Sequence, residues 1–205
     1  MEDLTPALAV LGGYLLGSLP FGYWLPLLVR GENIRTRGSG NVGASNVFRV
    51  YGRRLGIAVA LLDLAKGFAA ALLGVWAGGP LVGVLAGAAA MVGHARPVFL
   101  RFEKGGKMVA TAGGAFLALA PVATLCCVGV WLAVFVLTRY ASVASIVTAA
   151  ALVVFVPLLG AGWPVIALAV AGAAAIVFLH RHNLRRLAGG TEHRFELPVR
   201  KPGIR

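Results

Sequence analysis

Long runs of apolar residues are the feature that most constrains how this chain can fold. A transmembrane helix needs about 20 mostly apolar residues, because the hydrocarbon core is about 30 Å thick and each helical residue rises about 1.5 Å. A shorter apolar run lies between Lys107 and Pro121 and predicts one short additional helix. We therefore expect an all-α polytopic membrane protein with seven transmembrane helices, one of them short. The six longer runs cover residues 4–29, 55–77, 81–100, 121–138, 143–159 and 163–180.

The composition leaves little room for a separate soluble part. Of the 205 residues, 59% are apolar and 13% are charged, whereas about 25% of the residues of a soluble domain are charged. We expect one membrane domain over residues 1–205. Glu2 and Asp3 stand where a secretory signal peptide carries basic residues, so we do not interpret the first run as a cleaved signal.

Basic residues concentrate in three parts of the chain, at residues 30–54, 93–111 and 180–205. We call these the first, second and third basic segments. The connections at 78–80 and 160–164 carry no charge. Short cytoplasmic loops of membrane proteins collect Lys and Arg. Seven helices then place the N-terminus outside and the C-terminus in the cytoplasm. We assign most of the net charge of +12 to this topology and to attraction to anionic lipid, and we expect no nucleic-acid partner.

The first basic segment contains RGSGNVGASNVFR at residues 37–49. Glycines allow backbone N–H groups to turn toward an anion, Ser and Asn add neutral donors, and Arg49 adds a charged one. The pattern differs from a P-loop, because no Gly-Lys-Ser/Thr follows it, and from a dinucleotide fingerprint, because no strand precedes it. It indicates either a phosphate-binding loop or a flexible connection between helices.

The second and third basic segments offer similar chemistry. Gly105, Gly106 and Lys107 precede the short helix, and a helix N-terminus favours a bound anion. A positively charged helix cap is the alternative. The third segment contains HRHNLRRLAGGTEHRF at residues 180–195, in which polar residues recur at helical spacing. The alternative there is an amphipathic tail lying on anionic lipid.

Ionisable and small polar residues also occur within the apolar runs. Asp63 and Lys66 are three residues apart in one run, so we expect a mutual pair, because unpaired charges are costly in hydrocarbon. We expect His94 to be a packed or interfacial residue. Ser142 and Ser145 could bond a neighbouring helix or face the basic segments. The sequence has no zinc-ligand spacing and no acidic cluster, and we predict no metal and no cofactor.

Taken together, these segments resemble the PlsY family, the bacterial acyl-phosphate:glycerol-3-phosphate acyltransferases. The resemblance runs in order through the chain. It is carried by GSLPFGYWL at 17–25, GSGNVGASNVFR at 38–49, DLAKG at 63–67, GHARPVFLRFEKGGKMVAT at 93–111 and HRHNLRRLAGGTE at 180–192.

The resemblance implies transfer of a fatty acyl group from acyl phosphate to glycerol 3-phosphate, giving lysophosphatidic acid and phosphate, at the cytoplasmic side of the bacterial inner membrane. It implies catalytic roles for Arg49, Lys107 and His180. The implied substrate-binding residues are Ser39, Gly40, Asn41, Ser45, Asn46, Gly105, Gly106, Ser145, Asn183 and Glu192. The chain departs from the family pattern at Val42, where proline is common, at Ser45, where threonine is common, and at Met108, where glycine is common. The motifs do not specify an oligomeric state or which segment binds which phosphate.

No Ser-His-Asp arrangement and no HxxxxD motif supplies an evident general base. We therefore expect positioning and charge stabilisation to dominate catalysis, with the phosphate of the donor accepting the hydroxyl proton. His180 then either positions glycerol 3-phosphate or acts as the base. From the basic segments alone, an organic-phosphate transporter is a competing function. A lipid kinase is a weaker one, because it would need carboxylates for magnesium near the glycine-rich loops.

Overall fold

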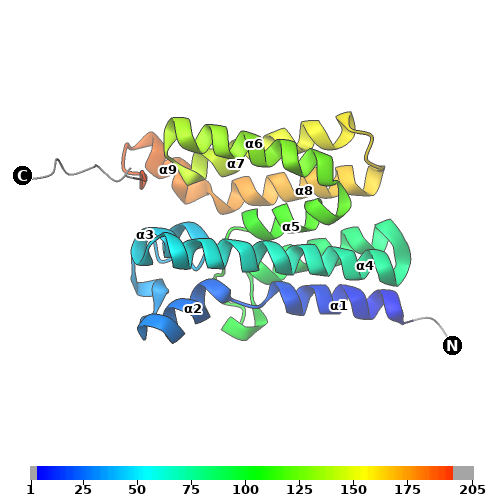
Figure 1. Cartoon of the computed structure of the whole chain (residues 1–205), viewed down its shortest axis with the longest axis horizontal. Coiled ribbons are helices and arrows are strands. Elements are labelled where there is room, and N and C mark those ends of the chain that lie inside the picture. The colour runs from blue at the N-terminus through cyan, green and yellow to red at the C-terminus, as the bar shows by residue number, and fades with distance from the viewer. Residues whose placement is uncertain (1–3, 196–205) are drawn as a thin grey trace, which may run out of the picture.

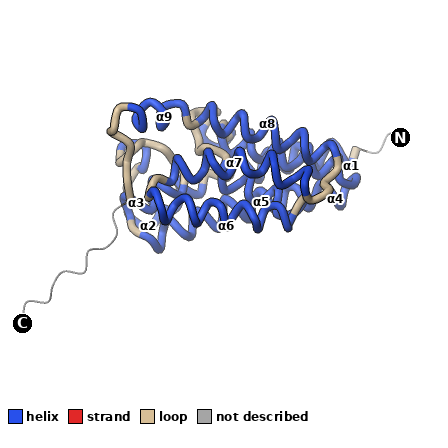
Figure 2. Tube along the Cα trace, turned by 90° about the horizontal axis from the view of Figure 1, so that it is seen from above, coloured by secondary structure: helices blue, strands red, loops and turns tan. Residues whose placement is uncertain are grey.

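The computed structural model describes residues 4–195, which form helices and connections without strands (Figure 2). The long helices run side by side along one axis, and α2, α3 and α9 lie at the end opposite the N-terminus (Figure 1). We call this end the basic end. The predicted all-helical fold is confirmed for these residues. The predictions made for Glu2, Asp3 and the third basic segment beyond residue 195 lie outside the described residues.

The first predicted span is two helices rather than one. α1 (Thr5–Gly17) and α2 (Phe21–Arg30) are separated by three residues that end in Pro20. Proline lacks the N–H that would continue the helical ladder, and it disfavours helical geometry in the residue before it. The expectation of an uninterrupted helix over residues 4–29 is therefore wrong. The two helices together are still long and apolar enough to cross a membrane.

Two predicted runs lie within α4 (Arg53–Ala95). Its backbone leaves helical geometry at Gly78 (φ −172°, ψ 26°) and Gly79 (φ 78°, ψ −168°), where two helical arms meet. A Cβ added to Gly74, before the break, would lie 2.5 Å from the carbonyl oxygen of Val82, after it. The second arm therefore folds back along the first, as the two separate runs predicted.

The remaining apolar runs form helices close to their predicted bounds. α5 (Val109–Leu119) is the predicted short helix. The second arm of α4 ends at Ala95 rather than at residue 100, because Pro97 prevents its continuation; η2 (Val98–Leu100) follows. The other helices are α6 (Pro121–Thr138), α7 (Ala141–Leu158), α8 (Trp163–Leu179) and α9 (Arg181–Ala188).

By length and composition, 4 helical stretches of the described residues could cross a membrane. The pair of α1 and α2 counts once in this total, and so does α4 with its following turn. α8 and α9, which are bent by 53°, add a fifth stretch if they are taken as one span. The structure therefore agrees with a multi-pass membrane protein.

Glycines allow the helices to approach closely. A Cβ added to Gly17 of α1 would overlap the backbone of Ala90 in the second arm of α4, and a Cβ on Gly114 of α5 would overlap the Leu64 carbonyl in the first arm. Membrane helices pack through such small residues, because lipid provides no hydrophobic force that drives them together. α1 and α5 are thereby held against α4, and the turn before α5 is held with them.

The first basic segment contains more helix than the sequence predicted. η1 (Ile34–Thr36) and α3 (Ala44–Tyr51) lie within it, so the glycine-rich stretch is a loop only as far as Gly43. Four buried apolar side chains attach this segment to the first arm of α4. They are Ile34, Val42, Val47 and Val59.

Candidate active site

The amide of Asn46 shapes the first basic segment from within. Its Oδ1 accepts a hydrogen bond from the Ser39 N–H (2.9 Å), and its Nδ2 donates to the carbonyls of Arg37 (3.1 Å) and Asn41 (2.9 Å). Asn46 is 2% exposed, so the polar groups of this predicted binding residue bond to the backbone of the loop. The Gly40 N–H is also used, donating to the Arg37 carbonyl (3.0 Å). Ser39 and Gly40 themselves are exposed.

Two contacts join the first basic segment to the second. The Asn41 Nδ2 donates to the Gly105 carbonyl (3.2 Å), 64 residues away in the sequence. Its Oδ1 accepts from the Gly43 N–H (2.8 Å), which fixes the orientation of the amide. Arg35 forms an ion pair with Glu103 (2.5 Å). The two segments therefore form one continuous surface at the basic end.

Gly105 and Gly106 pack against the end of α4. The Gly105 N–H donates to the Ala95 carbonyl (2.9 Å), and the Gly106 N–H donates to the His94 carbonyl (3.0 Å). A Cβ on Gly106 would overlap the His94 imidazole. The expectation that these two N–H groups are free to bind an anion is therefore wrong. Glycine is required here because the backbone lies against His94.

Met108 follows Lys107 in a left-handed conformation (φ 69°, ψ −14°) and is the N-cap residue of α5. A side chain in this conformation costs about 1–2 kcal/mol. This cost is a physical reason for the glycine that is common at this position in the family named above. The Met108 side chain is buried, and it packs into the apolar core.

A connected cluster of side chains surrounds Lys107, and we call it the Lys107 cluster. The Lys107 ammonium donates to the Asn183 Oδ1 (2.5 Å), and the Asn183 Nδ2 donates to Oε1 of Glu192 (2.7 Å). The Ser142 hydroxyl donates to the same oxygen (2.9 Å). The Arg186 Nε donates to the other carboxylate oxygen (2.7 Å). The second basic segment, α7, α9 and the connection after α9 thus meet at one carboxylate.

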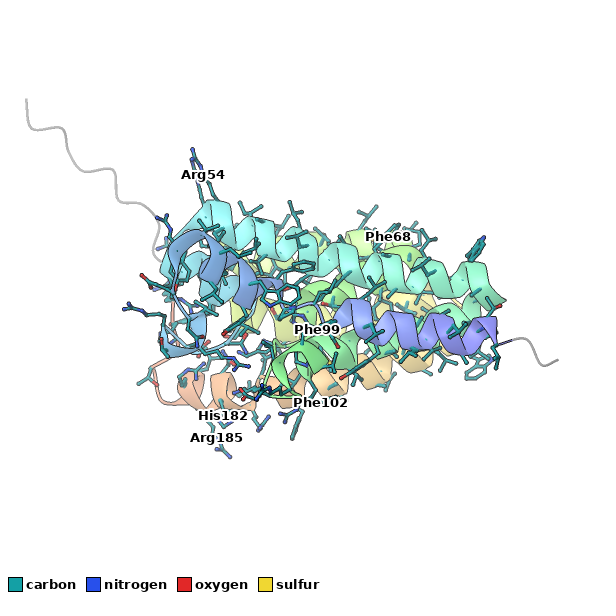
Figure 3. All side chains as sticks on the ribbon, turned by 90° about the horizontal axis from the view of Figure 1, so that it is seen from below. Arg54, Phe68, Phe99, Phe102, His182 and Arg185 are labelled. Atoms are coloured by element: carbon teal, nitrogen blue, oxygen red, sulfur yellow. The ribbon has the colours of Figure 1, made fainter. Side chains whose placement is uncertain are left out.

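α9 turns only part of its polar surface toward this cluster. Asn183 is buried, and Arg186, three residues later, is half-buried. His182 and Arg185 point away from the bundle (Figure 3). The polar residues expected from helical spacing therefore fall on two sides of α9. Asn183 and Arg186 face the cluster, and His182 and Arg185 face away from the bundle (Figure 3).

Burial and hydrogen bonding set the charges of the cluster. Burial alone would raise the pKa of the Glu192 carboxyl, but hydrogen bonds from Asn183, Ser142 and Arg186 outweigh it and hold the pKa below its usual range. Burial lowers the pKa of Lys107 to about 8, with Glu192 opposing this effect and nearby cations adding to it. At neutral pH, Glu192 is ionised and Lys107 is mainly protonated.

Arg49 of α3 adds a further cation. Its guanidinium lies 4.9 Å from the centroid of the Phe195 ring, which is within range of a cation–π interaction. Burial lowers the pKa of Arg49, and the nearby Glu192 carboxylate opposes this effect. The Arg49 Nε is buried without a hydrogen-bond partner. Ser45, one turn earlier on α3, is exposed.

His180 lies between α8 and α9 and is 4% exposed. Its Nδ1 is 2.8 Å from the Ile176 carbonyl, so in the neutral ring Nδ1 carries the proton and Nε2 is an acceptor. The Nε2 has no hydrogen-bond partner among the described residues. Burial and, to a smaller extent, the charge of Lys107 together lower the pKa of His180 to about 4. The ring is therefore neutral near pH 7.

Ser142, rather than Ser145, contacts the Lys107 cluster. The Ser145 hydroxyl donates to the Ala141 carbonyl (2.7 Å) and accepts from the Trp131 Nε1 (3.3 Å), which ties α7 to α6. Residues three apart share a helix face, so spacing alone could not distinguish the two serines. Arg186 was also missed as a partner of Glu192, although its spacing from Asn183 indicated a common face.

The cluster carries more positive than negative charge. Lys107, Arg186 and Arg49 surround the single carboxylate of Glu192, which leaves an excess of two positive charges. A doubly charged phosphate would balance this excess. Within residues 4–195, no group of three or more His, Cys, Asp or Glu side chains is arranged to hold a metal ion.

The sequence model of the family described as glycerol-3-phosphate acyltransferase matches residues 7–190. The chain belongs to this family. A glycerol-3-phosphate acyltransferase of Desulforudis audaxviator is 44% identical over 195 residues, covering 95% of this chain and 98% of that protein. One from Aquifex aeolicus is 45% identical over 190 residues, covering 91% and 97%.

Solved structures of PlsY, an integral membrane glycerol 3-phosphate acyltransferase, share the fold of this family member. The glycerol 3-phosphate form has a TM-score of 0.89 and 41% identity, covering 93% of this chain and 96% of that one. The lysophosphatidic acid form has a TM-score of 0.86 and 40% identity, covering 93% and 95%. The predicted family and the predicted glycerol-3-phosphate acyltransferase activity are confirmed, and the transporter and kinase alternatives are not supported.

Proposed function

We propose that this acyltransferase takes its acyl group from acyl phosphate and transfers it to glycerol 3-phosphate, forming lysophosphatidic acid and phosphate. The PlsY structures with glycerol 3-phosphate and with lysophosphatidic acid support the acceptor and the product. The observation that carries the proposal is the excess of two positive charges around Glu192. Both substrates bear a phosphate, so a donor with its own phosphate uses this charge at the reacting centre.

In the proposed reaction, a hydroxyl oxygen of glycerol 3-phosphate attacks the acyl carbonyl carbon. The bond from that carbon to the phosphate oxygen breaks, and the phosphate leaves with the electron pair and accepts the hydroxyl proton. Lys107 and Arg49 stabilise the charge on the leaving phosphate. The His180 Nε2 accepts a hydrogen bond from the attacking hydroxyl and positions it, because a neutral ring with a pKa of about 4 is a poor proton acceptor at neutral pH.

The remaining predicted site residues have two proposed roles. Asn41 and Asn46 build the surface through side-chain hydrogen bonds to backbone groups, Gly105 and Gly106 do so through their N–H groups, and Ser145 supports α7. Asn183 and Glu192 of the Lys107 cluster contact substrate directly, and so do the exposed side chains of Ser39 and Ser45. Gly40 allows the loop to approach the substrate closely. Ser142 and Arg186 hold Glu192 in place.

We further propose one membrane domain over residues 1–205 with seven crossings. This count takes α1 with α2 as one crossing, each arm of α4 as one, and α5, α6, α7 and α8 as one each. An odd number agrees with the positions of the N-terminus and α9 at opposite ends of the bundle (Figure 1). The basic end then faces the cytoplasm, since it carries the Lys and Arg residues, and the membrane is the bacterial inner membrane.

The donor is tested by offering acyl phosphate, acyl-CoA and acyl carrier protein in parallel to the purified protein with glycerol 3-phosphate. We expect lysophosphatidic acid only with acyl phosphate, together with one phosphate released per acyl group transferred. Turnover with acyl-CoA and none with acyl phosphate would overturn the donor assignment.

A further inference from the structure

A second ionic cluster lies inside the helical bundle, and we call it the membrane cluster. The Lys66 ammonium is 2.8 Å from the Asp63 carboxylate, and the His94 Nδ1 is 3.5 Å from the same oxygen. The three residues are 2%, 4% and 6% exposed in the order Asp63, Lys66, His94. The pairing of Asp63 with Lys66 confirms the prediction from their spacing. The addition of His94 joins the two arms of α4.

The membrane cluster reaches the interruption between α1 and α2. The Lys66 ammonium donates to the Leu19 carbonyl (2.8 Å), next to the proline that ends the first helix. It also lies 5.7 Å from the centroid of the Phe21 ring. Lys66 therefore has polar partners on two elements, and its position depends on both.

The same cluster reaches the loop that carries Lys107. The His94 carbonyl accepts the Gly106 N–H (3.0 Å), and the His94 ring fills the space that a Cβ on Gly106 would occupy. The next residue is Lys107, whose ammonium contacts Asn183. A continuous series of contacts thus runs from Lys66 through Asp63, His94 and Gly106 to the Lys107 cluster.

We propose that Asp63, Lys66 and His94 are positioning residues for the acyl-transfer reaction. Asp63 orients the His94 ring, the ring holds Gly106 in place, and Gly106 sets the position of the Lys107 ammonium. A buried ion pair inside a membrane helix is costly and is retained where it has a role. The inference rests on the proposed function for the role of Lys107, but the contact between His94 and Gly106 can be tested without it.

The test is a double-mutant cycle. We expect Gly106→Ala to lower kcat/KM by about 100-fold, because a displacement of about 1 Å near the reacting groups can cost this much. His94→Ala should lower it by about 10-fold, since the loop loses its support. The double variant has room for the added methyl group, so it should be at least about 10-fold more active than Gly106→Ala alone. No recovery in a folded double variant would overturn the proposal.

Gly17→Ala is the matched control, because its Cβ would overlap the backbone of Ala90 on the same arm of α4 rather than the His94 ring. His94→Ala should not rescue it, and rescue of both glycine variants would indicate general loosening and overturn the proposal. If Gly106→Ala alone does not fold, recovery of folded protein in the double variant supports the contact, and its absence contradicts the contact.

Kinetic parameters separate positioning from folding. Loss of folded protein lowers the apparent kcat and leaves KM unchanged. If His94→Ala instead displaces Lys107, the kinetic parameter that changes, kcat or KM, should be the one that changes in Lys107→Ala. A lower kcat alone in His94→Ala, with KM changed only in Lys107→Ala, would overturn the positioning role.

If the wild type fails to use acyl phosphate, the proposed function fails. Calorimetric binding of glycerol 3-phosphate to the same variants then still measures whether the double variant recovers.

Discussion

Lys66 is buried and Lys107 is partly buried, and these two lysines, each near a carboxylate, are paired differently. Lys66 contacts Asp63 directly, at 2.8 Å. Lys107 reaches Glu192 only through the amide of Asn183, while Arg186 contacts that carboxylate. In the membrane cluster one lysine matches one carboxylate, whereas three cations share Glu192.

This difference separates a structural charge from one available to a ligand. The Lys66 ammonium forms an ion pair with Asp63 and donates a hydrogen bond to the Leu19 carbonyl, and both contacts lie inside the bundle. Lys107 makes one hydrogen bond within the described residues and retains donors at the basic end. Breaking the first pairing should lower stability and should affect activity only through the Gly106 loop, whereas removing the second lysine should lower activity directly.

The largest expected effect is the loss of Lys107. Lys107→Ala should lower kcat/KM by about 100-fold to 1,000-fold, the range seen when a donor that stabilises developing charge is removed. Steady-state assays in detergent, with size-exclusion chromatography to confirm folding, measure it. Lys104→Ala, an exposed lysine in the same loop, is the control and should stay within about threefold of wild type. Near-normal turnover of Lys107→Ala would remove Lys107 from the site.

Breaking the membrane cluster should reduce stability instead. Asp63→Asn leaves Lys66 buried without its carboxylate, which we expect to cost about 3–5 kcal/mol, as for other broken buried ion pairs. The measurement is the midpoint of thermal unfolding in detergent. Asp63→Asn combined with Lys66→Met removes both charges and should recover part of the loss. Equal midpoints for the single and double variants would contradict direct pairing as the source of stability.

The pH dependence should report Lys107. With its pKa lowered to about 8, kcat/KM should fall about tenfold per pH unit above that value, as the ammonium loses its proton. Unfolding is not the cause, because the unfolded lysine has the higher pKa, 10.5. The unfolded state therefore binds more protons between these values, so this group adds stability as pH rises through that window. In Lys107→Arg the side chain stays charged, so the fall in kcat/KM at alkaline pH should disappear. If the fall is unchanged in this variant, it comes from the titration of another group.

The smallest expected effect concerns His180. If the ring positions glycerol 3-phosphate, His180→Gln should raise KM by about tenfold and lower kcat by far less than the 100-fold to 10,000-fold typical of a lost general base. The shape of the pH profile should be unchanged, because the neutral ring does not titrate between pH 5 and 8. A large fall in kcat with unchanged KM and loss of the acidic limb would make His180 the base.

The sequence alone determined the helical membrane fold, the three basic segments and the family. Each depends on local properties: the lengths of apolar runs, the positions of Lys and Arg, and motifs read in order along the chain. It also predicted the pairing of Asp63 with Lys66, because residues three apart on a helix are neighbours.

Only the tertiary structure decided which groups of the candidate site are free. Gly105 and Gly106 are typical of anion-binding loops, yet their N–H groups bond carbonyls at the end of α4. Ser142 reaches Glu192, 50 residues away, while Ser145 bonds within the helices. Such contacts depend on how helices distant in the sequence pack, which local pattern does not specify. The partners that this packing supplies therefore distinguish Lys107, whose remaining donors lie at the basic end, from Lys66, whose partners lie inside the bundle.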